Sequence, residues 1–405
     1  MKRVLFVADS LRVGGLEKSL ITLLKNFNYD EYAVELYLFN EGRDLLPQLP
    51  PQVKVLPQSP LFREYYLLPL GSSVKALCKK REYSLALRRV LRTVKPRLLR
   101  LLHIAYRPDT PADWRTKKKT LLRLNTHYDA AIGYAEGTAN HYVADCVDAD
   151  RKIGWIHTDV RYTSFNVRQE RRMLNRLDYL VTVSNNSKRS ILSYLPELAE
   201  KIRVLPNLLD REEILTLAKE TPEGMDTTQR CAKIVSVGRL VELKGFHLCP
   251  EVCRRLLDEG YPIHWYVVGE GEYRAEIEKA IKSNRVENSF TLLGERENPY
   301  CYEYHADICV QPSKYEGRSV VIEEMKLLRK PIVASRIDSF REALEDGKNA
   351  LLTERTPEGL FLGLKRLLDA PETADAFRRE NDRKKDINRQ VLAEIENLLD
   401  TERKN

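Results

Sequence analysis

Short apolar runs, separated by longer amphipathic segments, recur along two parts of the chain. In the first part the runs lie at 3–8, 33–39, 130–134, 152–156, 179–184 and 202–207. In the second part they lie at 233–238, 263–269, 290–294, 307–312 and 331–335. Helical spacing of apolar residues marks segments between these runs, namely 16–27, 246–259, 272–283 and 319–328. This alternation predicts two α/β units, each built on a parallel sheet.

A polar segment separates the two parts. Residues 209–230 show no strong strand pattern, so we expect a linker there. This places a first domain at 1–208 and a second at 231–385, and the region 356–403 is predicted to be mainly helical and highly charged. Since parallel sheets bind ligands beyond the carboxyl ends of their strands, the expected ligand site is a cleft between the two domains.

Composition excludes several classes of protein. Of the 405 residues, 43% are hydrophobic, which is enough for packed cores and too many for a disordered or collagen-like chain. No run reaches the ~18 consecutive apolar residues of a membrane span, and the run that follows Met1 is too short for a secretory signal. Seven scattered cysteines indicate reduced thiols in a cytosolic protein.

The positive charge is concentrated between residues 61 and 125. The net charge of the chain is +8, and this stretch holds 17 Lys and Arg against four acidic residues. Within it, 74–80, 85–92 and 98–102 mix Leu and Val with Lys and Arg at helical spacing. We expect a basic helical insertion that suits an anionic membrane surface, where each nearby cation adds about 1 kcal/mol. The alternatives are a solvated face without a partner and a nucleic-acid surface, although no nucleic-acid motif accompanies the stretch.

The segment 312–324 follows a predicted strand and opens a predicted helix. The amides of 317–320 would lie at the helix N-terminus, where free N–H groups and the helix dipole bind an anion such as phosphate. Glu316 and Glu324 are separated by about 12 Å along a helix, comparable to the distance from a sugar across a diphosphate to a ribose. Carboxylates suit sugars because they accept hydrogen bonds from paired hydroxyls.

A second strand-to-helix connection carries two cations. Arg239 and Lys244 follow the run 233–238, and Gly245 precedes the next helix. Two fixed cations beside a helix start would neutralise the charge that grows on a diphosphate leaving group. Taken alone, they also fit two ordinary surface cations.

Two glycine loops complete the set of strand-end motifs. Gly14 and Gly15 lie in the first strand-to-helix loop, where they either form an ordinary turn or permit close backbone contact with phosphate or sugar. The Gly-Glu-Gly segment 269–271 begins like a dinucleotide fingerprint, but Arg274 stands where the third glycine would be. We therefore interpret it as a tight loop and expect neither NAD nor FAD.

Together these residues resemble glycosyltransferase family 4, the retaining nucleotide-sugar transferases of GT-B fold. The matching segments are 14–15, 204–207, 237–245, 267–271, 312–324 and 331–335. The resemblance implies an α/β GT-B fold, in which two Rossmann-like domains with parallel sheets face each other across a cleft. It implies that the first domain binds the acceptor and the second the nucleotide-sugar, and that a C-terminal helix at 386–405 crosses back to the first domain. The insertion at 61–125 lies outside the family pattern.

The resemblance also implies roles for individual residues. Arg239 and Lys244 would bind the donor diphosphate. Glu316 would hold hydroxyls of the transferred sugar, and Glu324 those of the ribose. His157, after the run 152–156, resembles the family's histidine that faces the reacting sugar, and together with Arg239, Lys244 and Glu316 it forms the predicted catalytic set. The base would lie against 294–296, and the further donor-binding residues would be Gly15, Gly294, Glu295, Arg296, Gly317, Arg318, Ser319 and Val320.

No metal or cofactor is expected. Asp148-Ala149-Asp150 has the form of the Asp-x-Asp metal motif found in the other major transferase fold, but it precedes a strand instead of following one. Arg151 and Lys152 follow directly, so we expect surface ion pairs at this place. The charge that a metal would supply comes instead from Arg239, Lys244 and the helix dipole.

The sequence therefore predicts a retaining, metal-independent hexosyltransferase that moves a sugar from a UDP- or GDP-sugar to a hydroxyl acceptor. A lipid-linked glycan in cell-surface polysaccharide synthesis is the favoured acceptor, and the insertion would attach the cytoplasmic protein to the inner face of the cell membrane. A same-fold epimerase, a glycogen-type synthase and a non-catalytic nucleotide-sugar-binding protein are the alternatives. The family often has an aromatic or small residue at the place of Arg318. This guanidinium would add a phosphate contact or favour an acidic or differently oriented donor, so the sequence does not identify the sugar.

Overall fold

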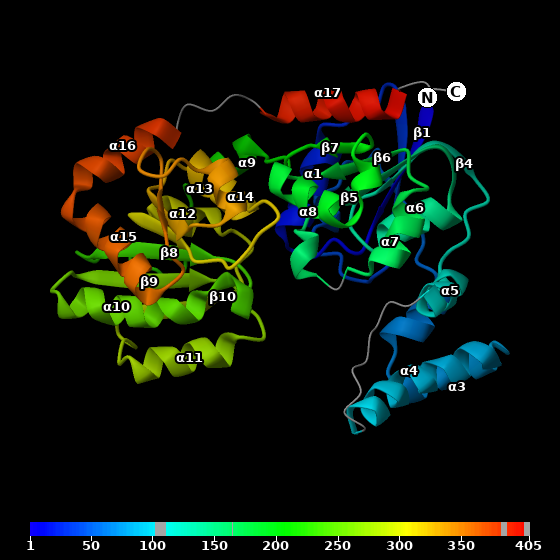
Figure 1. Ribbon diagram of the computed structural model, residues 1–405, viewed down its shortest axis with the longest axis horizontal. Helices are drawn as coiled ribbons and strands as arrows, with labels where there is room; N and C mark the ends of the chain where they lie inside the picture. The colour runs from blue at the N-terminus through cyan, green and yellow to red at the C-terminus, as the bar shows by residue number, and fades with distance from the viewer. Residues whose placement is uncertain (102–110, 164, 382–386, 401–405) are drawn as a thin grey trace. The chain divides into compact units, whose positions relative to one another are not determined.

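Two units, each built around one parallel sheet, make up the computed structural model of the chain (Figure 1). It describes residues 1–101, 111–163, 165–381 and 387–400. The first unit consists of Met1–Val183, Lys188–Leu205 and the described part of Val391–Asn405. The second consists of Ser184–Ser187 and Pro206–Gln390.

The sheet of the first unit has seven parallel strands in the order β3-β2-β1-β4-β5-β6-β7. Their bounds are β1 Lys2–Ala8, β2 Tyr32–Leu38, β3 Lys54–Val55, β4 His127–Gly133, β5 Asp148–Ile156, β6 Tyr179–Thr182 and β7 Ile202–Val204. The apolar runs are nearly continuous because helices cover both faces of the central strands. The strand order reverses between β1 and β4, which is where open α/β sheets bind their ligands.

Helices of the first unit connect these strands. They are α1 Gly15–Lys25, α6 Thr138–Cys146, α7 Val167–Leu174 and, from Lys188 onward, α8 Asn185–Tyr194, with short 3-10 turns at Leu46–Gln48, Val160–Tyr162 and Pro196–Leu198. The C-terminal helix α17, Ile387–Asp400, belongs to this unit from Val391 onward. Its Val391 and Ile395 are buried, and Asp400 accepts hydrogen bonds from Lys2 Nζ at 2.6 Å and from the Tyr32 hydroxyl at 2.9 Å. Residues 386 and 401–405 of the expected C-terminal segment lie outside the described residues.

The predicted basic insertion is mainly helical in its described residues. It contains α2 Pro60–Phe62, a π-helical turn Arg63–Leu67, α3 Leu70–Lys79, α4 Tyr83–Leu101 and α5 Pro111–Thr120. A small core of its own holds α3 and α4 together, made of Tyr65, Leu77, Leu85 and Ala86. The third mixed segment, 98–102, falls on the end of α4, and Leu102 lies outside the described residues.

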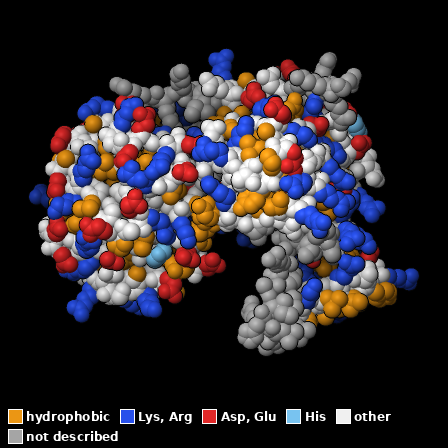
Figure 2. All heavy atoms as spheres, in the orientation of Figure 1, with side chains coloured by type: hydrophobic (Ala, Val, Ile, Leu, Met, Phe, Trp, Pro, Cys, Tyr) orange, Lys and Arg blue, Asp and Glu red, His pale blue; other side chains and the backbone are white. Residues whose placement is uncertain are grey.

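One face of α4 is apolar and exposed. Tyr83 is 64% exposed, Leu87 62% and Leu91 52%, and Val94 continues the same face. These four residues, which we call the α4 stripe, follow one another at intervals of three and four, so they line one side of the helix. On the α3–α4 pair, at the lower right of Figure 2, hydrophobic side chains (orange) lie beside Lys and Arg side chains (blue). No helix of the described residues is long and apolar enough to cross a membrane.

The second unit has a six-stranded parallel sheet in the order β10-β9-β8-β11-β12-β13. The strands are β8 Ala232–Val237, β9 Ile263–Val268, β10 Phe290–Gly294, β11 Ile308–Gln311, β12 Ile332–Ser335 and β13 Leu351–Thr353. The helices are α9 Arg211–Leu217, α10 Cys249–Asp258, α11 Arg274–Ser283, α12 Tyr300–His305, α13 Val320–Leu327, α14 Asp338–Ala343, α15 Pro357–Asp369 and α16 Pro371–Asn381. Short 3-10 turns lie at Glu242–Lys244 and Phe246–Leu248.

Two apolar layers cover this second sheet. One face packs against α10, α11 and α15, through residues such as Val252, Ile277 and Leu360. The other packs against α12, α13 and α14, as Figure 1 shows, through residues such as Ile322 and Phe340. The strand order reverses between β8 and β11, so the loops after these strands are where a ligand is expected.

Each predicted apolar run contains a strand, and three features go beyond the prediction. The short strands β3 and β13 are absent from it because two or three residues carry too little pattern. The expected linker 209–230 contains a helix, α9. Ile214 and Ala218 of that segment pack with Tyr300 and Leu328, so apolar contacts tie it to the second unit.

Candidate functional site

Three glycines meet at the carboxyl ends of β8, β9 and β10 in the second unit. Gly238 N donates to Val268 O at 2.9 Å, and Gly269 N donates to Gly294 O at 2.8 Å. Gly269 has a φ of +145°, and a Cβ there would lie 2.0 Å from Gly238 O. Because no side chain fits between these backbones, the segment 269–271 is the tight loop that the sequence predicts.

Two predicted catalytic residues, Lys244 and Glu316, lie in contact. Lys244 Nζ is 2.6 Å from Glu316 Oε1, and the two side chains are 18% and 15% exposed. The Ser313 hydroxyl donates to the same oxygen at 2.8 Å. Beside them, Lys314 N donates to Leu243 O at 2.7 Å, so the loop after β8 and the loop after β11 are joined by backbone as well as by charge.

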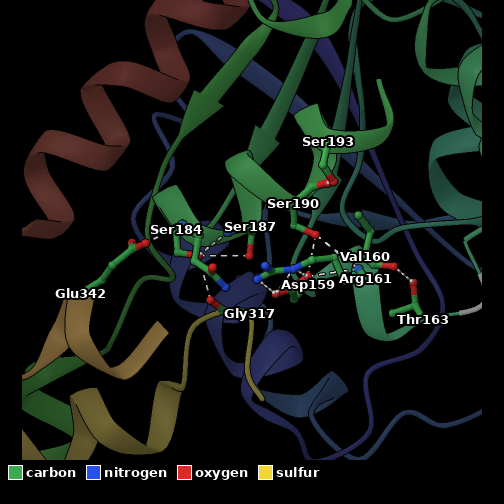
Figure 3. A network of polar contacts seen from close by, with 11 residues as sticks. Asp159, Val160, Arg161, Thr163, Ser184, Ser187, Ser190, Ser193, Gly317 and Glu342 are labelled. Atoms are coloured by element: carbon green, nitrogen blue, oxygen red, sulfur yellow. Dashed lines mark hydrogen bonds and ion pairs between the residues drawn. The ribbon is translucent and has the colours of Figure 1, made fainter. Parts of the chain in front are cut away.

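The loop after β11 leads into the N-terminus of α13. Ser319 caps this helix, since its hydroxyl accepts a hydrogen bond from Ile322 N at 3.3 Å. Gly317 and Val320 flank that cap, and Gly317 O accepts a hydrogen bond from the Ser184 hydroxyl at 2.8 Å (Figure 3). The predicted cradle 317–320 is therefore a helix start with its first amides directed outward along the axis.

Arg318 is turned toward its own helix. Its Nη2 is 2.7 Å from Glu323 Oε1, and both side chains are largely buried, at 17% and 9% exposed. Lys326 Nζ lies 3.6 Å from the other oxygen of Glu323. This guanidinium, for which the sequence left open a phosphate contact or an effect on the choice of donor, pairs with a carboxylate of α13 and anchors the loop to that helix.

Glu324 is almost fully buried on α13, with 4% of its surface exposed. It lies close to Tyr300, whose pKa is raised by burial and further by the negative charge of Glu324.

The remaining predicted donor residues of the second unit lie at the surface. Arg239 is exposed and forms no hydrogen bond or ion pair through its side chain with the residues that the structure describes. Glu295 is exposed too, whereas Arg296 Nη1 pairs with Glu223 Oε2 at 3.0 Å. Gly294 takes a left-handed φ of +77°, which favours glycine at that turn.

The first unit holds Gly15 and His157. Gly15 is the first residue of α1. His157 follows β5 and is 9% exposed. Its backbone N–H donates to Glu136 Oε2 at 3.1 Å, and its ring Nε2 donates to Tyr134 O at 3.2 Å. The imidazole stacks on Trp155 with an angle of 9° between the rings, which fixes its orientation.

Two acidic residues at the strand ends of the first unit escaped the sequence prediction. Asp9 follows β1, and Glu136 follows β4, at the reversal of strand order. Asp9 keeps accessible surface, yet the atoms packed around it raise the pKa of its carboxyl by desolvation; Lys117 opposes this shift and Glu136 adds to it. The available signal was their place shortly after predicted strands, at the end of the sheet where ligands bind, because carboxylates accept hydrogen bonds from hydroxyls.

Polar contacts within each unit order the segments beyond β5 and beyond β6 (Figure 3). In the first unit, Asp159 is 1% exposed and accepts hydrogen bonds from Arg161 Nη2 and from the Ser190 hydroxyl, each at 2.5 Å. Desolvation raises the pKa of this carboxyl, but the hydrogen bonds from Arg161 and Ser190 outweigh it, so the net pKa is lowered. In the second unit, Glu342 accepts hydrogen bonds from Asn185 N and Asn186 N.

The Asp148-Ala149-Asp150 segment lies at the surface, where its carboxylates pair with a histidine that the sequence analysis did not single out. His127 Nδ1 lies 3.1 Å from Asp148 Oδ2 and His127 Nε2 lies 3.1 Å from Asp150 Oδ2, so a histidine takes part in the polar contacts at this exposed place. The charge of Asp148 also acts on Lys152: desolvation lowers the pKa of this lysine, and Asp148 opposes the shift by a smaller amount. Hydrogen bonds that the His127 ring donates to Asp150 and Asp148 raise the pKa of His127, because they stabilise the charged imidazolium. The two ring nitrogens point to different carboxylates and do not converge on one point. Within the described ranges, no group of three or more acidic, His or Cys side chains is arranged to hold a metal ion.

Comparison with known proteins finds two family models that together run along most of the chain. Glycosyltransferase Family 4 matches residues 13–213, and Glycosyl transferases group 1 matches residues 225–384. The α-D-kanosaminyltransferase of Streptomyces kanamyceticus is 29% identical over 34% of this chain and 37% of its own length. A Campylobacter jejuni transferase, which adds N-acetylgalactosamine to a diphospho-undecaprenol-linked saccharide, is 27% identical over 51% of this chain and 54% of its own length. These matches therefore span about a third to a half of the relatives.

Solved structures of similar fold cover nearly the whole chain. Anabaena HepE in complex with UDP and glucose has a TM-score of 0.70 at 18% identity, covering 99% of this chain and 100% of its own. Staphylococcus aureus TarM has a TM-score of 0.66 at 15% identity, covering 99% of both chains. The predicted α/β class with two Rossmann-like units of GT-B type is confirmed.

Proposed function

Because the chain belongs to the GT-B glycosyltransferases of family 4, we propose that it transfers a sugar from a nucleotide diphosphate sugar to a hydroxyl acceptor. The observation that carries this proposal is the Lys244–Glu316 pair, half-enclosed beside the N-terminus of α13. It puts a cation, a carboxylate and free helix amides together at the ligand-binding end of a parallel sheet. These are the groups that a sugar diphosphate needs.

The cations would bind the diphosphate. An ammonium group has three donors, so Lys244 can keep its hydrogen bond to Glu316 and still donate to a phosphate oxygen. Arg239, exposed and unpaired among the described residues, adds a second positive charge in the loop after β8. Charge grows on the leaving diphosphate as the sugar–phosphate bond breaks, so these groups act most strongly in the transition state.

The carboxylates would recognise the two sugars of the donor. Glu316 accepts hydrogen bonds from hydroxyls of the transferred hexose, and Glu324 accepts them from the ribose. A UDP donor agrees with the UDP complexes of similar fold, such as that of HepE. The base then lies against Gly294, Glu295 and Arg296.

The reaction proposed is a metal-independent transfer with retention. The acceptor hydroxyl attacks the anomeric carbon on the face that the diphosphate leaves, through an oxocarbenium-like state. A phosphate oxygen of the donor takes the acceptor proton, and His157 is a further proposed catalytic residue. Lys244, Arg239 and the dipole of α13 supply the positive charge.

The proposed acceptor is a lipid-linked glycan at the inner face of the cell membrane. The relative from Campylobacter jejuni is named for a diphospho-undecaprenol acceptor. The α4 stripe supports membrane attachment because its exposed apolar side chains lie beside Arg88, Arg92 and Lys95, a pattern that binds anionic surfaces.

The proposed donor site is tested by binding and by turnover. A panel of UDP- and GDP-sugars is screened for thermal stabilisation, and the stabilising donors are then followed by NMR with and without acceptor. In the Lys244→Ala variant we expect kcat to fall about ten-fold or more, as for loss of one charge-stabilising donor. Lys282→Ala, which removes an exposed lysine on α11, serves as the control.

Three outcomes would contradict the proposal. A normal kcat in the Lys244→Ala variant would show that this lysine has no role in catalysis. Epimerised donor without transfer identifies an epimerase, and donor binding without any turnover identifies a binding protein.

A further inference from the structure

The connection between β13 and α15 reaches the two loops that carry Lys244 and Glu316. Its Arg355 donates a hydrogen bond from Nε to Pro312 O at 3.0 Å. The same guanidinium donates from Nη2 to Glu242 O at 3.2 Å. Glu242 precedes Lys244 by two residues, and Pro312 precedes Glu316 by four. A single planar group is therefore bonded to the backbone of both loops.

The loop of Lys244 and the loop of Glu316 are in close backbone contact at Gly245. Gly245 has a φ of +75°, and a Cβ there would lie 2.1 Å from Pro312 O and 3.3 Å from Arg355 Nε. The backbones thus touch at Gly245, and the hydrogen bond from Lys314 N to Leu243 O joins them again nearby. The hydrogen bonds of Arg355 to Pro312 O and Glu242 O are a further connection between the same two loops.

The chemistry of the contact requires arginine. The guanidinium presents donors at fixed angles in one plane, whereas a lysine ammonium on its flexible stem cannot span two carbonyls in the same geometry. Both acceptors are neutral, and no carboxylate pairs with Arg355 among the described residues, so its charge is not cancelled. The charge acts on the neighbouring His247. Desolvation is the larger cause that lowers the pKa of this histidine, and the positive charge of Arg355 is the next.

We propose that Arg355 is a positioning residue that holds the loop of Lys244 and the loop of Glu316 at the separation at which one sugar diphosphate contacts both. This inference rests on the proposed function. The two side chains act on one ligand, so a shift of about 1 Å between their loops would cost on the order of a hundred-fold in rate. Arg355 acts through the backbone of both loops and touches neither reacting atom.

The test compares Arg355→Ala and Arg355→Lys with a matched arginine. Arg336 follows β12, donates from Nη2 to Leu352 O at 2.5 Å and pairs with Asp346 at 2.9 Å, but it contacts neither loop. Loss of Arg336 therefore removes a guanidinium–carbonyl bond of the same kind from the same unit. The measurements are kcat and KM for the donor, the melting temperature, and amide hydrogen exchange of the ligand-free protein.

For Arg355→Ala we expect kcat/KM for the donor to fall about ten-fold to a hundred-fold, with a fall in melting temperature no larger than that of Arg336→Ala. Guanidinium ion added at millimolar concentration should restore part of the activity that Arg355→Ala loses. It should not increase the activity of Arg336→Ala. Arg355→Lys should lie between the wild type and Arg355→Ala. Retention of kcat/KM within two-fold, or an equal loss in Arg336→Ala, would overturn the proposal.

Hydrogen exchange separates this inference from the proposed function. Without ligand, Arg355→Ala should speed exchange of amides in both 238–245 and 312–319 by about ten-fold, while Arg336→Ala leaves them unchanged. If the wild type transfers no sugar but this exchange pattern is found, the proposed function fails and the role in loop positioning stands. If exchange in the two loops is unchanged, the positioning role fails whatever the activity.

Discussion

At the scale of single residues, the candidate donor site is a set of charges kept partly out of water. Lys244 and Glu316 neutralise each other at 2.6 Å with most of their surface covered. Arg318 and Glu323 do the same on α13. Pairing of this kind lowers the cost of holding charges in a half-buried site before the ligand arrives. Glu324 is the most buried of the predicted site carboxylates, and its exposed fraction is 4%.

Replacement of Glu324 by Gln should weaken nucleotide binding. The amide keeps the shape of the side chain but removes the charge, and a hydrogen bond to a charged group is worth about 1.5–3 kcal/mol. We expect the Kd for UDP, measured by calorimetry, to rise at least about ten-fold.

The control uses the ligand in place of a second variant. UDP lacking the ribose 2′-hydroxyl should bind the wild type more weakly than UDP does, while Glu324→Gln should bind the two equally. An undiminished preference for UDP in Glu324→Gln would show that this carboxylate does not contact the ribose.

At the scale of elements, the loops after strands carry the candidate chemistry and one surface helix carries the candidate membrane contact. The α4 stripe is exposed although the small core of the insertion packs on the same helix. Arg92 also lies over the Tyr66 ring at 4.4 Å, so one cation beside the stripe is held in place. An isolated basic helix would not show which of its apolar residues are left uncovered.

Leu87→Glu combined with Leu91→Glu should reduce binding to vesicles that contain anionic phosphatidylglycerol. Each leucine that enters the lipid interface contributes roughly 1.5–3 kcal/mol, so the partition coefficient measured by sedimentation should fall at least ten-fold. Leu362→Glu on α15 changes an equally exposed leucine, at 54%, and should leave binding unchanged. Equal binding by all variants would mean a solvated face, and preferential binding of duplex DNA would mean a nucleic-acid surface.

At the scale of the whole molecule, chain segments distant in sequence complete the units. The first unit takes its last helix from the far end of the chain, with Ile395 at 2% exposure and Asp400 bonded to Lys2 and Tyr32. The second unit is completed by the short segment Ser184–Ser187, which bonds to Gly317 and Glu342. Each sheet therefore depends on residues that follow or precede it by many elements.

Ile395→Ala should destabilise the first unit selectively. Removal of a buried isoleucine costs about 2–5 kcal/mol, and the part of α17 from Val391 onward belongs to the first unit. Hydrogen exchange should show loss of protection in β1 and β2 with β8 and β9 unchanged. Ala393→Ser, at an exposed position of the same helix, should have little effect, and equal loss in both sheets would contradict the separation of the units.

Much of the candidate site could be predicted because strand-end motifs are local. The run 307–312 and the helix pattern at 319–328 already place Glu316, Gly317 and Glu324 at a strand-to-helix connection. Strands repeat every two residues and helices every 3.6 residues. These periods appear within one short segment, so the segment alone predicts its element.

The contacts across segments needed the tertiary structure. Nothing local to Arg355 indicates that its guanidinium reaches Pro312 and Glu242, which lie 43 and 113 residues away in sequence. Local sequence also does not reveal three other features. These are the ion pair of Arg318 with Glu323, the pairing of His127 with Asp148 and Asp150, and the exposure of the α4 stripe. The sequence alone determined the strands, the helices and the chemical groups at their ends, because these depend on residues adjacent along the chain. Which groups pair, and which stay exposed, was decided only by packing, because burial and charge pairing depend on distance in space.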